Sequence, residues 1–100
     1  MQNPAVILLV RFRSALSMDE VKRIMVEREP EFRALTGLTQ KYYLHSPATG
    51  DVAGLYLWES SEAFTDYRDS ELRATIAKAY QAEGEPRIEV YDVISTLRDV

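Results

Sequence analysis

The stretch that decides the fold is Ala53-Gly54-Leu55-Tyr56-Leu57-Trp58, which ends in a run of large apolar side chains. Successive side chains of a strand point to opposite faces, so Leu55 and Leu57 share one face while Tyr56 and Trp58 share the other. We therefore predict a strand that is apolar on both faces and needs a cover on each.

The segments beside this strand predict a hairpin before it and a helix after it. Leu38–Ser46 has the composition of a partner strand, and Pro47–Asp51 supplies the turn, since proline pre-sets one φ and glycine accepts a positive φ. Ser60 or Ser61 is expected to cap the helix that follows. Asp69-Ser70 predicts a break and a fresh cap, so this helix is expected to continue as a second segment.

The two ends of the chain add one helix and two strands. Ala5–Phe12 is short, β-branched and apolar on both faces, and Ile88–Ile94 predicts the last strand. Ser17-Met18-Asp19-Glu20 fits a capping box at the start of the first helix. Pro30 is expected to end or kink that helix, and Gly37 to mark its stop.

The resulting order is β-α-β-β-α-β, which predicts an α+β, ferredoxin-like fold with a four-stranded antiparallel sheet. A chain of 100 residues suits one domain, residues 1–100. There is no cysteine, which excludes disulfides and thiol catalysis, and a net charge of −4 without a basic run argues against nucleic-acid binding. The apolar run Ala5–Val10 is too short to span a membrane and lacks the flanks of a signal peptide, so we expect no membrane contact and a cytoplasmic protein.

The strands also predict a homodimer. Both helices of this fold lie on one face of the sheet, so the other face should be polar in a monomer. Here the strands at 5–12 and 53–58 are apolar on both faces, and soluble monomers avoid so large an exposed patch. A second copy packed face to face is the economical cover. The alternative is a loop or the C-terminal tail folded over that face.

Two segments resemble known families. Trp58-Glu59-Ser60-Ser61-Glu62-Ala63-Phe64 resembles the W-E-S-x-E-A-F segment of dimeric α+β-barrel proteins, which include antibiotic-biosynthesis mono-oxygenases. Thr36-Gly37-Leu38, with Lys41, Tyr43 and the later Gly54-Leu55-Tyr56-Leu57, resembles the YdhR-like mono-oxygenases more closely. The resemblance implies a dimeric α+β barrel. It further implies a cofactor-independent mono-oxygenase that acts on a small phenol-, quinol- or anthrone-like molecule.

Three polar residues alternate along the strand expected at 38–46. Among these catalytic candidates, His45 is the only histidine and suits a general base near neutral pH, Lys41 suits charge stabilisation, and Tyr43 suits proton handling. The alternative for His45 is a solvated residue near the hairpin end. Whether the three face the same side as the aromatic residues of the next strand depends on the hairpin register, which the sequence leaves open.

The substrate pocket of the mono-oxygenase relatives lies between the sheet and the helices, and the resemblance places Trp58 and Phe64 in its lining. We expect Tyr56 and Tyr67 to converge with them and leave a slot for a planar ligand. The alternative is ordinary core packing of these aromatic side chains. Those relatives carry an asparagine four residues before the tryptophan, where this chain has Gly54.

No haem, flavin or metal is expected. The haem-degrading relatives carry a histidine ten residues after the aromatic that matches Tyr67, and Ala77 stands at that position here. The sequence also has no glycine-rich phosphate loop and no metal-ligand spacing of His, Asp and Glu. The expected partners are a second copy of the chain and a small aromatic molecule. The alternative function is a non-catalytic dimer that binds a small apolar ligand or serves a stress response.

Overall fold

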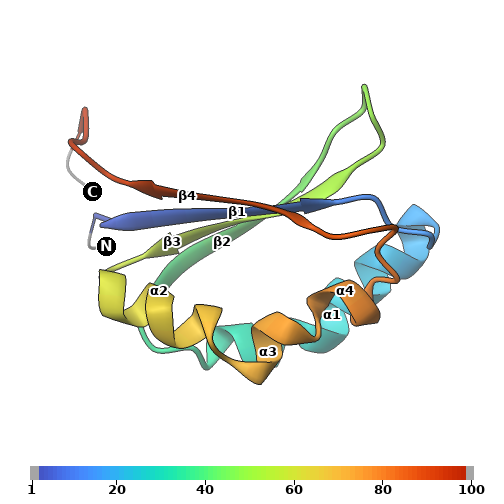
Figure 1. Ribbon diagram of the computed structural model, residues 1–100, viewed down its shortest axis with the longest axis horizontal. Coiled ribbons are helices and arrows are strands. Elements are labelled where there is room, and N and C mark those ends of the chain that lie inside the picture. The colour runs from blue at the N-terminus through green and yellow to red at the C-terminus, as the bar shows by residue number, and fades with distance from the viewer. Residues whose placement is uncertain (1–2, 99–100) are drawn as a thin grey trace.

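The computed structural model describes residues 3–98 and confirms the predicted order of elements. Strands β1 (Val6–Phe12), β2 (Leu38–His45), β3 (Val52–Trp58) and β4 (Arg87–Asp92) form one antiparallel sheet in the order β2-β3-β1-β4. The helices are α1 (Met18–Arg33), α2 (Ser61–Arg68), α3 (Glu71–Ala74) and α4 (Ile76–Ala79). All of them lie on one face of the sheet and leave the other bare (Figure 1).

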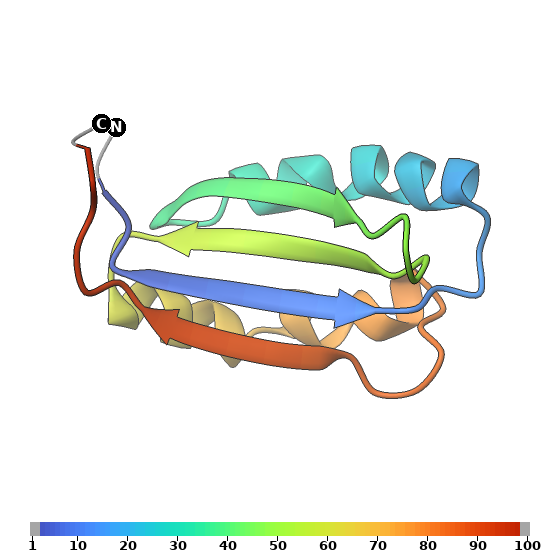
Figure 2. The ribbon, with the colours of Figure 1, turned by 90° about the horizontal axis from the view of Figure 1, so that it is seen from above.

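The helices divide the covered face between them. Seen from the bare side, α1 runs behind the β2 edge, and α2 to α4 run behind the half that ends in β4 (Figure 2). None of these helices, all within the described part of the chain, has the length and hydropathy needed to cross a membrane.

Local sequence signals set most helix starts. Ser17 is the N-cap of α1, where its hydroxyl accepts from the Glu20 amide and the Glu20 carboxylate accepts from the Ser17 amide, as the capping box predicts. Ser60 caps α2, and Ser70 caps α3 after the predicted break. Each serine satisfies an amide at its helix start, so each boundary can be read from the sequence.

Three helix boundaries differ from the prediction. Helix α1 runs through Pro30 and ends at Arg33, because the proline carbonyl still accepts from the Ala34 amide at 3.2 Å. Gly37 does not end the helix; with φ at +84° it turns the chain into β2. The second helical segment is divided at Thr75 into α3 and α4.

The hairpin register settles which side chains share a face. Residues directly opposite in an antiparallel pair lie on the same side of the sheet. The opposed pairs are Lys41 with Tyr56, Tyr43 with Gly54, and His45 with Val52. A β-bulge between Leu38 and Gln40 shifts the pairing beyond them. The three polar residues of β2 therefore lie on the same face as Tyr56 and Trp58, the face that the helices cover.

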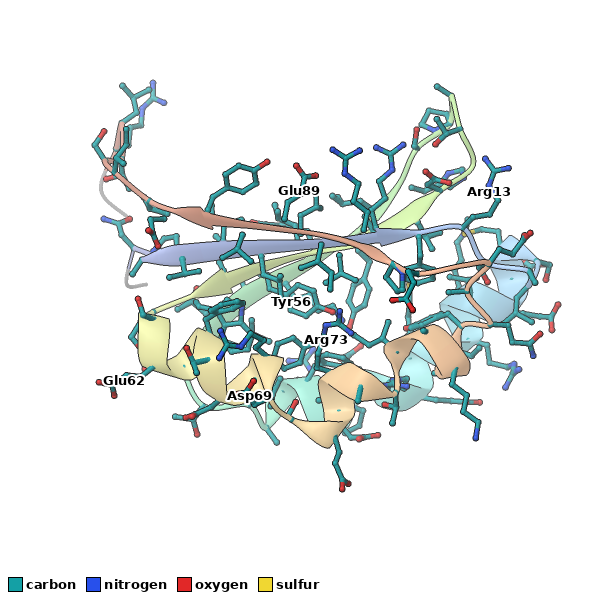
Figure 3. All side chains as sticks on the ribbon, viewed as in Figure 1. Arg13, Tyr56, Glu62, Asp69, Arg73 and Glu89 are labelled. Atoms are coloured by element: carbon teal, nitrogen blue, oxygen red, sulfur yellow. The ribbon has the colours of Figure 1, made fainter. Side chains whose placement is uncertain are left out.

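That covered face carries the core. Tyr56 and Arg73 lie in the layer between sheet and helices, whereas Glu89 lies on the bare side (Figure 3). Trp58 is 0% exposed and is among the largest fully buried side chains. The other buried core residues are Val6, Leu8, Val10, Val21, Phe32, Val52, Tyr56, Phe64, Tyr67, Ile76 and Tyr80.

The bare face carries an apolar patch that crosses all four strands. Leu9 on β1 lies opposite Leu55, and Leu55 lies opposite Tyr42, so their side chains form one row across the sheet. Tyr42 and Tyr91 are 50% and 53% exposed. We call the whole set the open-face patch: Ile7, Leu9, Tyr42, Leu44, Leu55, Leu57 and Tyr91.

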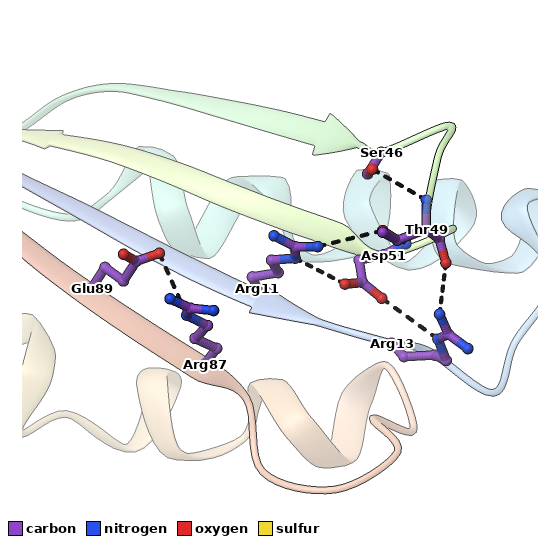
Figure 4. Close-up of polar contacts among 7 residues, drawn as sticks. All are labelled: Arg11, Arg13, Ser46, Thr49, Asp51, Arg87 and Glu89. Atoms are coloured by element: carbon purple, nitrogen blue, oxygen red, sulfur yellow. Dashed lines mark hydrogen bonds and ion pairs between the residues drawn. The ribbon is translucent and has the colours of Figure 1, made fainter.

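A charged cluster closes one end of this bare face (Figure 4). The Arg11 Nε donates to Asp51 Oδ2 at 2.8 Å, and the Arg13 Nε lies 3.5 Å from the other carboxylate oxygen. Arg13 also donates to the Thr49 carbonyl at 2.6 Å. The hydrogen bond from Arg11 holds the pKa of Asp51 below its ordinary value. These contacts tie the hairpin turn to the end of β1.

Candidate functional site

Four aromatic rings form a cluster between the sheet and the helices. The Tyr56 and Trp58 rings are nearly parallel, 4° apart, with centroids 6.3 Å from each other. The Tyr67 ring lies 5.3 Å from Tyr56 and 5.1 Å from Trp58, and its hydroxyl donates to the Tyr56 hydroxyl at 3.3 Å. Phe32 of α1 completes the cluster at 6.1 Å from Tyr56. Three of the four predicted binding residues therefore come together, closely packed by one another.

Phe64, the fourth predicted binding residue, lines a different hollow. This β4-side hollow has a volume of about 380 Å³ and lies between β4 and the α2–α3 region. Phe64 and Leu8 belong to its apolar wall, and Arg68 and Arg73 supply its charge. The structure thus separates Phe64 from the hollows that Lys41 lines.

Sequence reasoning did not select Phe32 as a site residue. Phe32 lies at helical spacing from Val21 and Met25 on the apolar side of α1, and it is 4% exposed. Nothing in that spacing shows which strand this side of the helix will meet. The structure shows that this ring meets both Tyr56 and the end of Lys41.

Lys41 ends among three aromatic rings. Its Nζ lies 3.4 Å from the centroid of Phe32, 4.4 Å from that of Tyr43 and 4.5 Å from that of Tyr56. None of the ion pairs formed within residues 3–98 includes this amine. Burial and the nearby Arg28 guanidinium lower the pKa of Lys41 to about 7, although the ring faces themselves favour the ammonium form. Both the protonated and the neutral form of the Lys41 amine are therefore populated near neutral pH.

Two hollows meet at Lys41 and Tyr43. The inner hollow extends from them over Gly54 to Tyr80 and has a volume of about 20 Å³, which is room for about one water molecule. The outer hollow lies between β2 and the end of α1 and has a volume of about 330 Å³. The volume of the outer hollow is in the range of small-molecule pockets, and Lys41 is among its lining residues.

Gly54 makes room for this arrangement. A Cβ on Gly54 would lie 2.9 Å from a ring carbon of Tyr56 and 3.3 Å from Cε of Lys41. The space that a side chain at position 54 would fill is therefore already filled by the Tyr56 ring and the lysine. This is the position where the mono-oxygenase relatives are expected to carry their asparagine.

Four tyrosines between the sheet and the helices stay protonated at neutral pH. Burial raises the pKa of Tyr67 and of Tyr80 to about 12, and it raises the pKa of Tyr56 well above its ordinary value. Burial also raises the pKa of Tyr43, which is 37% exposed and lines both hollows. The hydroxyl of Tyr43, which lines both hollows, is consequently available as a hydrogen-bond donor to a bound oxyanion.

His45 lies apart from this site. It is exposed at the end of β2 and is not among the residues that line either hollow beside Lys41. Within residues 3–98, no three side chains of His, Cys, Asp or Glu gather as a metal site would require. The polar group nearest to the aromatic rings is thus Lys41 rather than the histidine.

Comparison with known proteins identifies the fold. SnoaB, a cofactor-independent oxygenase from Streptomyces nogalater, matches with a TM-score of 0.74 at 14% identity, over 96% of this chain and 99% of that one. A mono-oxygenase from the gene ActVA-Orf6 of Streptomyces coelicolor, in complex with nanaomycin D, matches with a TM-score of 0.69 at 18% identity, over 97% and 94%.

A protein of unknown function, NE2512 from Nitrosomonas europaea, is equally similar, with a TM-score of 0.74 at 13% identity over 100% of this chain and 99% of that one. No family model and no curated protein matches the sequence. The structural matches confirm the predicted resemblance at the level of the fold, since this chain shares its α+β fold with these proteins and with an antibiotic-biosynthesis mono-oxygenase-like protein from Caulobacter crescentus.

Proposed function

We propose that this chain is a cofactor-independent mono-oxygenase that acts, as a homodimer, on a small phenol-, quinol- or anthrone-like molecule. Two proteins with its fold are named as oxygenases. The observation that carries the proposal is the Lys41 amine, placed between ring faces where two hollows meet. Planar substrates suit such a site because their rings stack on aromatic faces.

Lys41 has two roles in this reaction. As a neutral amine it accepts a proton from the substrate, whose anion then passes an electron to O₂. As an ammonium ion it stabilises the negative charge, first on the substrate and then on the reduced oxygen, and the Tyr43 hydroxyl donates a further hydrogen bond. For an anthrone the CH₂ group and O₂ become a carbonyl group and water, so atoms and electrons balance without a cofactor.

The other candidate residues do not contact the reacting atoms in this proposal. Tyr56, Trp58 and Tyr67 form the packed wall behind the lysine, and Phe64 belongs to the β4-side hollow. His45 is retained as a second candidate base, which would reach a substrate only at the hairpin end.

The test is O₂ uptake and carbonyl formation with a panel of quinols and anthrones. Lys41→Met should lower kcat by about 10²-fold, as loss of an acid–base group does, whereas the exposed control Lys78→Met should leave it within about twofold. A comparable loss in His45→Gln would instead assign the base to the histidine. No uptake above the buffer rate with any substrate would overturn the proposal. Binding without uptake would instead support the non-catalytic alternative.

The homodimer rests on the open-face patch. Its central leucines and its exposed tyrosines form one apolar surface that reaches all four strands of the bare sheet, and a second copy of the same surface would cover it with matching chemistry. Light scattering at micromolar concentration should give about twice the chain mass of 11.5 kDa. A folded monomer under these conditions would refute the dimer.

A further inference from the structure

The three lysines of the chain differ in their exposure to solvent. Lys22 on α1 and Lys78 on α4 are exposed, whereas Lys41 points into the aromatic cluster. An exposed lysine is almost entirely protonated at neutral pH and is a poor nucleophile. Desolvation in an apolar site is a recognised way in which a lysine becomes reactive toward carbonyl groups.

The surroundings of Lys41 also offer a place for the carbonyl partner. Lys41 and Tyr43 both line the outer hollow of about 330 Å³, and the Nζ of Lys41 lies 4.4 Å from the centroid of the Tyr43 ring. Tyr43 is 37% exposed, so an aryl group that entered the hollow would lie against its ring with its substituent beside Nζ. The amine has no carboxylate partner in residues 3–98 that such a ligand would have to displace.

We propose that Lys41 is a carbonyl-capturing amine, whose Nζ condenses with planar aromatic aldehydes in the outer hollow to form an imine. The Nζ lone pair attacks the carbonyl carbon, the resulting carbinolamine loses its hydroxyl group as water, and a C=N bond replaces the C=O bond. No electron is gained or lost. Tyr43 lines the same hollow, and its hydroxyl would donate a hydrogen bond to the departing oxygen. This activity needs only the amine and its hollow, so it stands independently of the mono-oxygenase reaction.

The rate of imine formation depends on the protonation state of Lys41, because only the neutral amine attacks a carbonyl group. Burial and Arg28 together bring the pKa of this amine to about 7, so the reactive neutral form is abundant at physiological pH. The groups that face the amine or share its hollow are Arg28, Glu29 and Arg33 of α1, Tyr43 of β2 and Tyr56 of β3. The buried tyrosines stay neutral over this range, so the lysine itself sets the midpoint.

The experiment is reductive trapping on the full-length protein. The protein is incubated without oxygen with 2-hydroxybenzaldehyde and cyanoborohydride, and peptide mass mapping then gives the labelling rate of each amine. Cyclohexanecarbaldehyde serves as the non-planar reference aldehyde. Lys22 and Lys78 are internal reference amines within the same sample.

Labelling of Lys41 should exceed that of the two reference lysines by at least about tenfold at pH 7 and should rise with a midpoint near pH 7. The ratio of aromatic to cyclohexyl labelling should also be higher at Lys41 than at either reference. Tyr43→Leu should lower that ratio while circular dichroism shows the fold intact, and Lys41→Arg should abolish the label at position 41.

Equal labelling of the three lysines, or no preference for the planar aldehyde at Lys41, would overturn the proposal. Because the trapping uses no O₂, a protein that fails to consume oxygen but captures aldehydes would contradict the mono-oxygenase function alone.

Discussion

The two faces of the sheet are both apolar, yet they differ in what interrupts them. On the covered face, a lysine and a glycine stand in the middle of the aromatic residues, and hollows open around them. On the bare face, leucine and isoleucine occupy the centre of β1 and β3, while charges lie beside them: Glu89 and Arg87 on β4, and Arg11, Arg13 and Asp51 at one end. An apolar centre with charges at its border suits a second subunit, whereas a surface with an amine in a hollow suits a small reactive molecule.

Removing the largest ring should give the largest effect. Trp58→Ala deletes a fully buried aromatic from the covered face, so we expect the free energy of unfolding to fall by about 3–5 kcal/mol. Urea denaturation measures the loss, and Trp58→Phe is the matched control that keeps a ring and should cost less. A clearly smaller loss for the alanine variant would mean that the ring already lacks packing partners and borders a true slot.

A charge at the centre of the bare face should separate the subunits. Leu55→Asp would bury an unpaired carboxylate between the two sheets, so the dimer should weaken by at least about 2 kcal/mol, or about 30-fold in Kd. Val26→Asp is the matched control, since Val26 is 69% exposed on α1, away from the bare face. Sedimentation equilibrium distinguishes the two, and an unchanged Leu55→Asp dimer would show that the subunits meet elsewhere.

The lysine on the covered face should make the free energy of unfolding depend on pH. The pKa of Lys41 is about 7 in the folded state and about 10.4 in an unfolded chain, so protons bind the unfolded state more strongly. The resulting destabilisation is complete below pH 7 and fades as the pH rises toward 10.

Lys41→Met removes this term, so it should stabilise the protein more at pH 6 than at pH 9. After allowance for partial exposure, we expect a difference of about 1–2 kcal/mol in denaturant titrations at the two pH values. The exposed Lys22→Met serves as the control and should show no such difference. An equal effect of Lys41→Met at both pH values would contradict the lowered pKa.

The charged end of the bare face should show the smallest effect. An NMR titration should place the pKa of Asp51 below that of an ordinary aspartate, and Arg11→Gln should raise it, because Arg11 donates the short hydrogen bond. The Asp51 carboxylate therefore favours the fold above its ordinary pKa and loses that contribution as the pH falls through its lowered value. A pKa unchanged by Arg11→Gln would show that the contact does not persist in solution.

The sequence predicted the fold well because most signals are local. The capping box at Ser17 and the turn residues at 47–51 act within a few residues, and both appear where they were expected. The end of α1 was predicted less well, since Pro30 only loses a donor that the helix can do without there.

The candidate site was predicted only in part because it depends on long-range pairing. Alternation along β2 grouped Lys41 with Tyr43, but only the register opposite β3 shows that both lie beside Tyr56. The contribution of Phe32 depends on how α1 lies on the sheet, which its own spacing does not contain. The lowered pKa of Lys41 also follows from that packing, so it could not be predicted from the sequence alone.

The crowding above Gly54 has a consequence for the descent of this protein. Any side chain at position 54 collides with the Tyr56 ring at 2.9 Å, and Trp58 and Tyr67 hold that ring in place. A single mutation to asparagine is therefore penalised unless position 56 becomes smaller first. The two positions are epistatic, because the residue tolerated at position 54 depends on the size of the side chain at position 56.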